Sequence, residues 1–370
     1  MSIIDFELEE FRKLCENVVP NSKIIACTTD NPFVRVEICE NKFNRNIVCC
    51  LRFPDLYPQQ PVLVELKSRT LSDKFLQGLS KLCETKAREH LGKPQCVLVL
   101  KFLQQYLVEN PLCVCFDEIQ QLRRDLQSEE TDGEQLKLKQ KIQTVQFCAR
   151  GGAYFYRLRA VIPDDYPQQC VDLQNAETNL PAVLLRYLNG QSREIARQCV
   201  QEPLRVTKGK KQTNTTFKPV PSLYRSLKFC LEATRDFYKE LCPICSSGVL
   251  PPDPEKLVVD DTKDEYVERV YCGHLFHQGC LKRFLREPPF PKGGKLCPAK
   301  RRHPRSDANN YLGGGIGKQI ADVREQCSSE TCGIRLAHDR WVVNVKVAES
   351  RWAQKQARER ELEEVVDFLK

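Results

Sequence analysis

Cysteine and histidine residues gather late in the chain as three closely spaced pairs and one further cysteine. They are Cys242, Cys245, Cys272, His274, His277, Cys280 and Cys297. A gap of 26 residues separates Cys245 from Cys272, and 16 residues separate Cys280 from Cys297. A tetrahedral zinc ion takes four thiolate or imidazole ligands, and a Cys-x-x-Cys turn supplies two of them. Seven ligands in this order predict a small module that folds around zinc.

The order of the pairs resembles the RING-H2 module. In that family the first and third ligand pairs share one zinc ion and the second and fourth pairs share another, so the resemblance implies two ions. The first site would be complete, with Cys242, Cys245, His277 and Cys280. The second would take Cys272, His274 and Cys297. Its fourth ligand is missing, because Lys300 stands where the family has a cysteine.

Several residues are candidates for the missing ligand. His303 is the nearest, and we expect it to be the eighth ligand, whereas Cys327 and Cys332 are more remote. A three-ligand site that stays open can hold a zinc-activated water and be catalytic. That alternative needs a carboxylate base in a cleft, and the nearby sequence does not supply one. We therefore expect a distorted structural site.

The same resemblance implies a surface for a ubiquitin-conjugating enzyme. Ile244, Phe284 and Pro298 stand where RING modules present an apolar groove to that enzyme, and Phe284 lies in a short predicted helix that starts at Leu281. Arg301 stands where many of them carry an arginine that binds the enzyme and its ubiquitin, and a guanidinium can engage two carbonyls at once. The alternatives are ordinary packing of the three apolar residues and a plain basic surface at Arg301.

A second feature is a repeat in the first two thirds of the chain. Residues 53–61 read FPDLYPQQP, and about 109 residues later 162–170 read IPDDYPQQC. Self-similarity at this distance indicates a duplicated domain. Proline fixes φ and removes a donor, so Tyr57-Pro58 and Tyr166-Pro167 predict rigid corners that end a strand meander, with structural tyrosines.

Hydrophobic periodicity places strands before each Tyr-Pro pair and helices around them. The strands are expected at 34–38, 47–53, 142–148 and 153–161, and the helices at 4–18, 71–106 with a break at 92–94, 117–127, 182–201 and 222–240. Each unit is thus an α+β domain with helices against an antiparallel sheet.

The Tyr-Pro turns resemble the RWD domain, a relative of the ubiquitin-conjugating enzyme fold. The chain is accordingly divided into an RWD-like domain at 1–112, a divergent RWD-like domain with a basic linker at 113–240, a RING-type module at 241–305, a flexible insertion at 306–346 and a terminal helix at 347–370. The second copy is divergent because Cys170 replaces the closing proline.

Neither copy reads as an active conjugating enzyme. Such enzymes place a His-Pro-Asn triplet before a nucleophilic cysteine, and this sequence has no such triplet. Cys83 and Cys199 fall within apolar helical patterns, which indicates buried, inert thiols. We therefore expect binding modules and no catalytic residue on this chain.

Composition limits the remaining classes of function. No apolar run approaches the ~20 residues of a membrane helix, and the acidic start is unlike a signal peptide, so we expect a protein of the cytosol or nucleus. The net charge of +8 is concentrated at 203–231 and 282–305. Basic clusters can attract nucleic acid, but a solvated linker and a solvated surface are the simpler interpretation of these two stretches.

Taken together, the order of domains resembles RWD–RING ubiquitin ligases of the Fanconi anaemia type. The resemblance implies a ligase without a covalent intermediate, whose partners are a charged conjugating enzyme, ubiquitin and an unidentified protein substrate. Two other functions stay open. One is a non-catalytic adaptor with a degenerate RING-like fold, and the other is a zinc-stabilised nucleic-acid binder that uses the stretch at 282–305.

Overall fold

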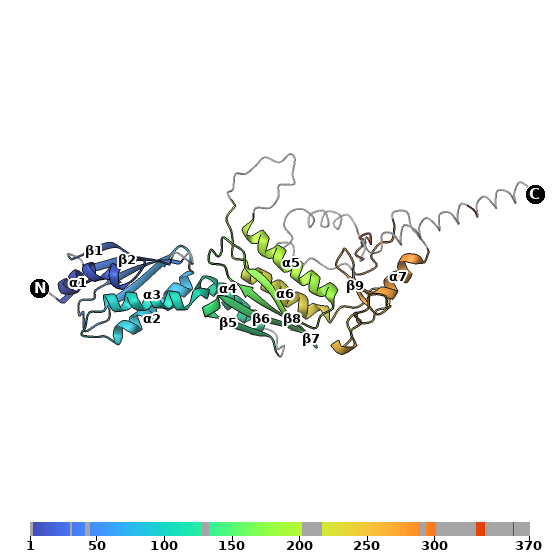
Figure 1. Ribbon diagram of the computed structural model, residues 1–370, viewed down its shortest axis with the longest axis horizontal. Helices are drawn as coiled ribbons and strands as arrows, with labels where there is room; N and C mark the ends of the chain where they lie inside the picture. The colour runs from blue at the N-terminus through green and yellow to red at the C-terminus, as the bar shows by residue number, and fades with distance from the viewer. Residues whose placement is uncertain are drawn as a thin grey trace, which may run out of the picture.

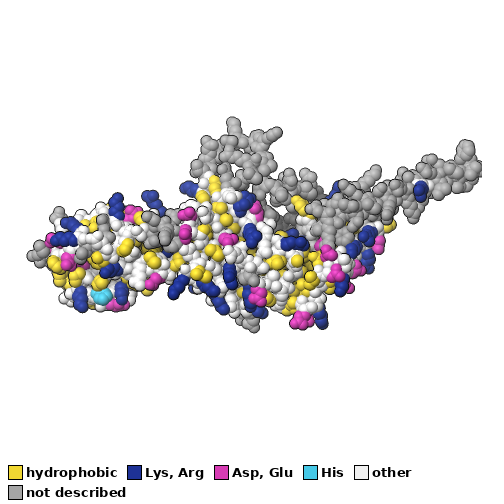
Figure 2. Space-filling view, in the orientation of Figure 1, with side chains coloured by type: hydrophobic (Ala, Val, Ile, Leu, Met, Phe, Trp, Pro, Cys, Tyr) yellow, Lys and Arg dark blue, Asp and Glu magenta, His cyan; other side chains and the backbone are white. Residues whose placement is uncertain are grey.

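The computed structural model describes residues 3–29, 32–40, 45–127, 133–201, 217–288, 294–300 and 331–336, together with Arg358. Two units of the α+β class, called the α/β units below because each combines helices with a sheet, and a small third module follow one another along an elongated molecule (Figure 1). Lys and Arg side chains are interspersed with Asp and Glu over the visible face of both α/β units (Figure 2), a pattern typical of a solvated surface. Within the described residues, no helix is both long and apolar enough to cross a membrane.

The first unit is a four-stranded antiparallel sheet with helices packed against it. Its elements are α1 (Ile3–Val18), β1 (Ser22–Thr28), β2 (Phe33–Glu40), β3 (Arg45–Arg52), β4 (Leu63–Ser68), α2 (Asp73–Arg88) and α3 (Cys96–Glu109), with strand order β1-β2-β3-β4. The Ser72 hydroxyl caps α2 by accepting a hydrogen bond from the Phe75 amide. Phe75, Leu79 and Cys83 recur at helical spacing and are buried in the core of this unit.

The second unit repeats this plan. A 3-10 turn at Pro111–Cys115 leads into α4 (Phe116–Gln127), and the remaining elements are β5 (Gln135–Lys139), β6 (Thr144–Gly151), β7 (Tyr154–Val161), β8 (Asp172–Thr178), α5 (Ala182–Val200) and α6 (Leu223–Phe237). The sheet is again an antiparallel meander, in the order β5-β6-β7-β8. Both units therefore confirm the predicted α+β fold class and its duplication.

A buried hydrogen-bond network surrounds the Tyr-Pro turn of the first unit. The Tyr57 hydroxyl donates to the Glu7 carboxylate of α1. The Gln95 amide, at the start of α3, donates to Glu7 at 2.8 Å and to the Tyr57 oxygen at 3.0 Å. The Glu7 carboxylate thereby accepts a hydrogen bond at the amino-terminal end of α3, where backbone amides lack partners within the helix. Tyr57 is thus a structural residue.

The second unit builds the same network from equivalent elements. The Tyr166 hydroxyl donates to Glu118 of α4 at 2.6 Å, and the amides of Ser222 and Tyr224 at the start of α6 donate to Tyr166 and Glu118 at 2.8 and 2.9 Å. Burial raises the pKa of Glu118 to about 7, against the lowering effect of its hydrogen bonds. Both Tyr-Pro peptide bonds are cis. The repeat read from the sequence is therefore a repeat of side-chain contacts as well.

The predicted place of the turn in the chain was wrong. Each Tyr-Pro pair lies between the third and fourth strands of its sheet, and the meander ends one strand later, at β4 and β8. The strands that the sequence did not reveal are β1, β4, β5 and β8, which are the edges of the two sheets. An edge strand pairs on one side only and buries fewer apolar side chains, so its alternation is weaker.

The end of β6 lies very close to α6, at Gly151. A Cβ atom at this position would lie 2.1 Å from the carbonyl oxygen of Thr234. We expect Gly151→Ala to force the strand and helix apart and to lower the stability of the second unit by about 1–3 kcal/mol or more. Hydrogen exchange of the β6 and β7 amides measures this change.

Gly190 supplies the matched control for that substitution. It lies exposed in α5, and no atom stands within 4 Å of an added Cβ. We expect Gly190→Ala to stabilise the helix by about 0.5–1 kcal/mol, because alanine loses less backbone entropy. Equal effects of the two substitutions would contradict the close approach at Gly151.

The third module contains β9 (Val267–Arg269), β10 (Leu275–His277) and α7 (Gln278–Arg286). β9 and β10 form a two-stranded antiparallel sheet, and α7 confirms the short helix expected from Leu281. Buried residues of this module, including Val267, Phe276 and Leu281, belong to the same hydrophobic cluster as the core of the second unit. The module is therefore docked on that unit.

Candidate metal centres

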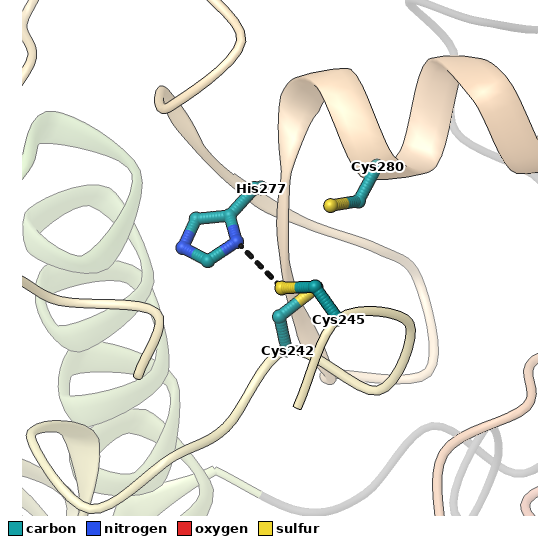
Figure 3. Close-up of side chains that lie close together, drawn as sticks. All are labelled: Cys242, Cys245, His277 and Cys280. Carbon is teal, nitrogen blue, oxygen red and sulfur yellow. Dashed lines mark hydrogen bonds between the residues drawn. The ribbon is translucent and has the colours of Figure 1, made fainter. Parts of the chain in front are cut away.

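The first ligand group is assembled from a turn, a strand and a helix. Cys242 and Cys245 lie in a turn that follows α6, in which the Ser246 amide donates to the Cys242 carbonyl at 2.8 Å. His277 ends β10, and Cys280 lies in the first turn of α7. The four side chains converge on one point, as Figure 3 shows.

The geometry of this group fits a tetrahedral metal ion. All four ligand atoms lie within 4.8 Å of one another, and the Cys245 sulfur is 3.3 Å from Nδ1 of His277. Ligands at ~2.3 Å from a tetrahedral zinc ion lie about 3.8 Å apart. The other ring nitrogen, Nε2 of His277, is 3.1 Å from the Gly248 carbonyl and donates to it, which orients Nδ1 toward the cysteines.

The electrostatics of the group favour thiolate at Cys242 and Cys245, whereas burial raises the pKa of the third cysteine, Cys280, to about 11. Burial raises the pKa of Cys242, but hydrogen bonds from His277 and from backbone amides outweigh it and lower that pKa to about 6. The hydrogen bond with Cys242 in turn raises the pKa of His277 to about 9, against the effect of its burial. A deprotonated cysteine is the form that binds metal. The donor set therefore suits a thiophilic cation such as zinc.

The second ligand group is Cys272, His274, Cys297 and Cys332, whose ligand atoms also lie within 4.8 Å of one another. Nδ1 of His274 is 3.3 Å from the Cys272 sulfur and 3.6 Å from the Cys297 sulfur. Gly273 between the first two ligands has φ +90, a backbone conformation that favours glycine, and makes the tight turn between them possible. This group also fits zinc.

Cys332 occupies the place for which the sequence offered no close ligand. Its amide donates to the Ala299 carbonyl at 2.7 Å, and the Cys297 amide donates to Ile334 at 2.8 Å. Lys300, at the position of the expected cysteine, is exposed and forms a β-bridge with Thr331. His303, the ligand expected from the sequence, lies outside the described residues. Within them, the fourth ligand is Cys332.

The module is longer than the sequence indicated. Residues 331–336 return to pair with residues 295–300, and Leu336 is buried in the shared core. The module thus reaches at least Leu336, beyond the boundary at 305 taken from the sequence. Most of the expected insertion lies outside the described residues, namely 306–330 and 337–346. So does the expected helix at 347–370, apart from the helical Arg358.

A tetrahedral ion bound by the four side chains of the second group would have no open coordination position. Three of them are buried and Cys272 is half-buried. A catalytic zinc site keeps one position for water, whereas a structural site is closed by four protein ligands. The alternative of a zinc-activated water therefore loses its basis, and both groups are suited to structural metal.

The two groups are interleaved along the chain. The first and third ligand pairs form one group, and the second and fourth pairs form the other. Each group therefore closes a loop of the chain that contains ligands of its neighbour. This is the pairing scheme expected from the sequence, with Cys332 as the eighth ligand.

The residues expected to contact a conjugating enzyme differ in exposure. Ile244 is 37% exposed. Pro298 is half-buried, and so is Phe284, whose ring lies 4.9 Å from the Lys295 ammonium. Arg301 lies outside the described residues. Leu241 and Leu296 are also exposed, at 60% and 51%, and the sequence reasoning missed them although each directly precedes a ligand.

Cys83 and Cys199 lie where the sequence placed them, inside helices and away from solvent. They are 0% and 3% exposed. Burial raises the pKa of Cys83 to about 12 and also raises that of Cys199. A nucleophilic cysteine needs a lowered pKa and an accessible sulfur. Neither thiol has the surroundings of a catalytic cysteine.

We expect Cys83→Ser and Cys199→Ser each to leave ubiquitin transfer unchanged within about twofold, because neither thiol is activated. The measurement is a charging reaction followed by a non-reducing gel. A ubiquitin thioester on either cysteine would show that one α/β unit acts as a conjugating enzyme.

Comparison with known protein families identifies the fold of the first unit. The RWD domain model matches residues 5–107, which span α1 to α3. No curated protein matches the chain. The chain therefore carries an amino-terminal RWD domain, a fold related to ubiquitin-conjugating enzymes, followed by a second α/β unit of the same plan and by Cys/His groups that can hold metal.

Proposed function

We propose that this protein is a RING-type E3 ubiquitin ligase that binds two zinc ions. The observation that carries the proposal is the interleaving of two four-ligand Cys/His groups within one small module. RING modules bind their two zinc ions in this order. The RWD domain at 5–107 supports a role next to a conjugating enzyme, since the two folds are related.

In the proposed mechanism this chain forms no covalent intermediate. The zinc module holds the ubiquitin-charged conjugating enzyme through Ile244, Phe284 and Pro298, and Arg301 restrains the enzyme and its ubiquitin. A lysine of the substrate protein then attacks the thioester. The contribution of the ligase is to position the two reactants, which alone can supply a large part of a rate enhancement.

The two α/β units serve as binding modules in this proposal. Their Tyr-Pro networks are buried and structural, and Cys83 and Cys199 are buried thiols with a raised pKa, so the units' contribution is to bind partners or the substrate protein. The expected partners are a conjugating enzyme, ubiquitin and an unidentified protein substrate. The zinc-bound cysteines suit the reducing cytosol or nucleus, where we propose that the protein acts.

The alternative is a non-catalytic adaptor. It drew its support from the missing ligand at Lys300, and Cys332 removes that support. The two functions are distinguished by the discharge of ubiquitin from a panel of charged conjugating enzymes to free lysine. Faster discharge with at least one of them supports the ligase. No acceleration across the panel would leave the adaptor as the function of the module.

Ile244 tests the surface for the conjugating enzyme. We expect Ile244→Ala to weaken the binding of that enzyme roughly tenfold or more, since truncating an apolar residue at an interface centre costs about 1–3 kcal/mol. Bound zinc stays the same, because Ile244 is not a ligand. Isothermal calorimetry and metal analysis measure the two quantities.

Val259→Ala is the control, because Val259 is an apolar residue of the same module that is 82% exposed and has no expected role in binding. It should leave the affinity unchanged. If both variants bind as tightly as the wild type, the assigned surface is wrong. A loss of zinc in Ile244→Ala would instead point to misfolding.

A further inference from the structure

The zinc module follows the second α/β unit with almost no intervening chain. α6 ends at Phe237, and the first ligand is Cys242. The Val249 amide, on the far side of the first ligand turn, donates to the Glu240 carbonyl at 3.0 Å. Phe237 and Cys242 belong to one hydrophobic cluster. The junction is thus packed and hydrogen-bonded.

An arginine of the zinc module stacks on a tyrosine of the second unit. The guanidinium carbon of Arg269, in β9, lies 3.5 Å from the centre of the Tyr187 ring in α5. That ring is itself held edge-on by Phe229 and Phe237 of α6, at 5.6 and 6.3 Å between ring centres. A guanidinium stacks flat on an aromatic face and gains up to about 2 kcal/mol when partly desolvated.

A second contact joins the two parts at a different point. The Tyr154 hydroxyl, at the start of β7, donates to the Pro251 carbonyl of the zinc module at 2.8 Å. Tyr154 is 2% exposed. Two contacts on different elements, together with the packed junction, oppose both bending and rotation of the module. Domains joined by small polar interfaces are ordinarily free to move, so this arrangement restrains a motion that is otherwise expected.

We propose that Arg269 and Tyr187 are positioning residues, which fix the direction in which the zinc module presents the conjugating enzyme and thereby select the lysines that receive ubiquitin. This inference rests on the proposed ligase function. A charged enzyme held at a constant angle reaches lysines within one region of a bound protein. Displacements of about 1 Å are enough to change rates strongly in reactions that depend on orientation.

The test separates positioning from activation in the full-length protein. Discharge of ubiquitin to free lysine reports activation alone, because free lysine diffuses to the thioester from any side. Mass spectrometry of self-ubiquitinated protein reports which lysines are reached. For Arg269→Ala and Tyr187→Leu we expect discharge within about twofold of wild type, while the share of the predominant lysine falls about threefold and new lysines are modified.

Conservative and neighbouring variants complete the design. Tyr187→Phe keeps the ring and should retain the wild-type pattern, and so should Arg186→Ala, which removes an exposed arginine next to Tyr187 on α5. Amide exchange of β9 should accelerate in Arg269→Ala alone among the arginine variants. Bound zinc, measured alongside, should be equal in all of them.

Four outcomes distinguish these possibilities. Normal discharge with a broadened lysine pattern supports the positioning role. An unchanged pattern in Arg269→Ala and Tyr187→Leu, or a loss of zinc and discharge together, overturns that role and leaves a stabilising contact. A wild-type protein that accelerates no discharge overturns the ligase function, and the positioning role with it.

Discussion

Cys332→Ser should reduce bound zinc from two ions per chain to about one. The second ligand group would keep Cys272, His274 and Cys297 and lose its only ligand from the returning segment at 331–336. Zinc binding to four-ligand structural sites contributes about 10–16 kcal/mol, and that free energy is available only to the folded module. We therefore expect local unfolding around β9 and β10 and loss of ubiquitin discharge. Metal analysis of the purified full-length protein measures the zinc.

Two controls use the other candidates from the sequence. His303→Ala and Cys327→Ser should each keep two zinc ions, because the described group already contains four ligands. If His303→Ala loses an ion while Cys332→Ser keeps both, the assignment of the fourth ligand is reversed. If the wild-type protein contains no zinc, the hypothesis that the two groups bind metal is wrong.

The contrast between Cys297 and Cys332 shows how far ligand spacing can predict a site. Six of the first seven ligands are recognisable because they form pairs two or three residues apart that lie within single turns, which local geometry brings together. By contrast, 34 residues separate Cys297 from Cys332, and the pairing of residues 295–300 with 331–336 brings them together. Backbone pairing at that distance leaves no local signal.

The same distinction explains which strands the sequence revealed. β2, β3, β6 and β7 are central strands, and each has an apolar run that was predicted. β5 reads Gln-Leu-Lys-Leu-Lys and buries no residue fully, because it is an edge strand. Its alternation is short and its apolar residues are few. The docking of the zinc module could not be predicted either. Tyr187 and Arg269 lie far apart in the sequence, because most of α5 and all of α6 stand between them.

Arg235→Met should destabilise the second α/β unit by about 3–5 kcal/mol. Arg235 of α6 donates from Nε and Nη2 to both carboxylate oxygens of Glu134, at 2.9 and 2.6 Å. The Glu134 side chain is only 2% exposed and that of Arg235 is 11% exposed. Methionine preserves much of the apolar volume but leaves a buried carboxylate without its cation, and removing one partner of a buried pair has a cost of this size. Hydrogen exchange of the β6 and β7 amides in increasing urea reports the opening of this unit.

Two further variants test whether burial of the ion pair, rather than its length, sets the loss of stability. Arg197 and Glu194 form a pair of the same 2.6 Å length on α5, but their side chains are 44% and 40% exposed. Arg197→Met should therefore cost less than about 1 kcal/mol, because water already solvates both charges. The double substitution Glu134→Leu with Arg235→Met should recover most of the stability lost in Arg235→Met, since no charge is then buried alone. If the single and double variants are equally unstable, the loss comes from packing around α6 rather than from an uncompensated charge. If Arg197→Met costs as much as Arg235→Met, desolvation is not the cause of either effect.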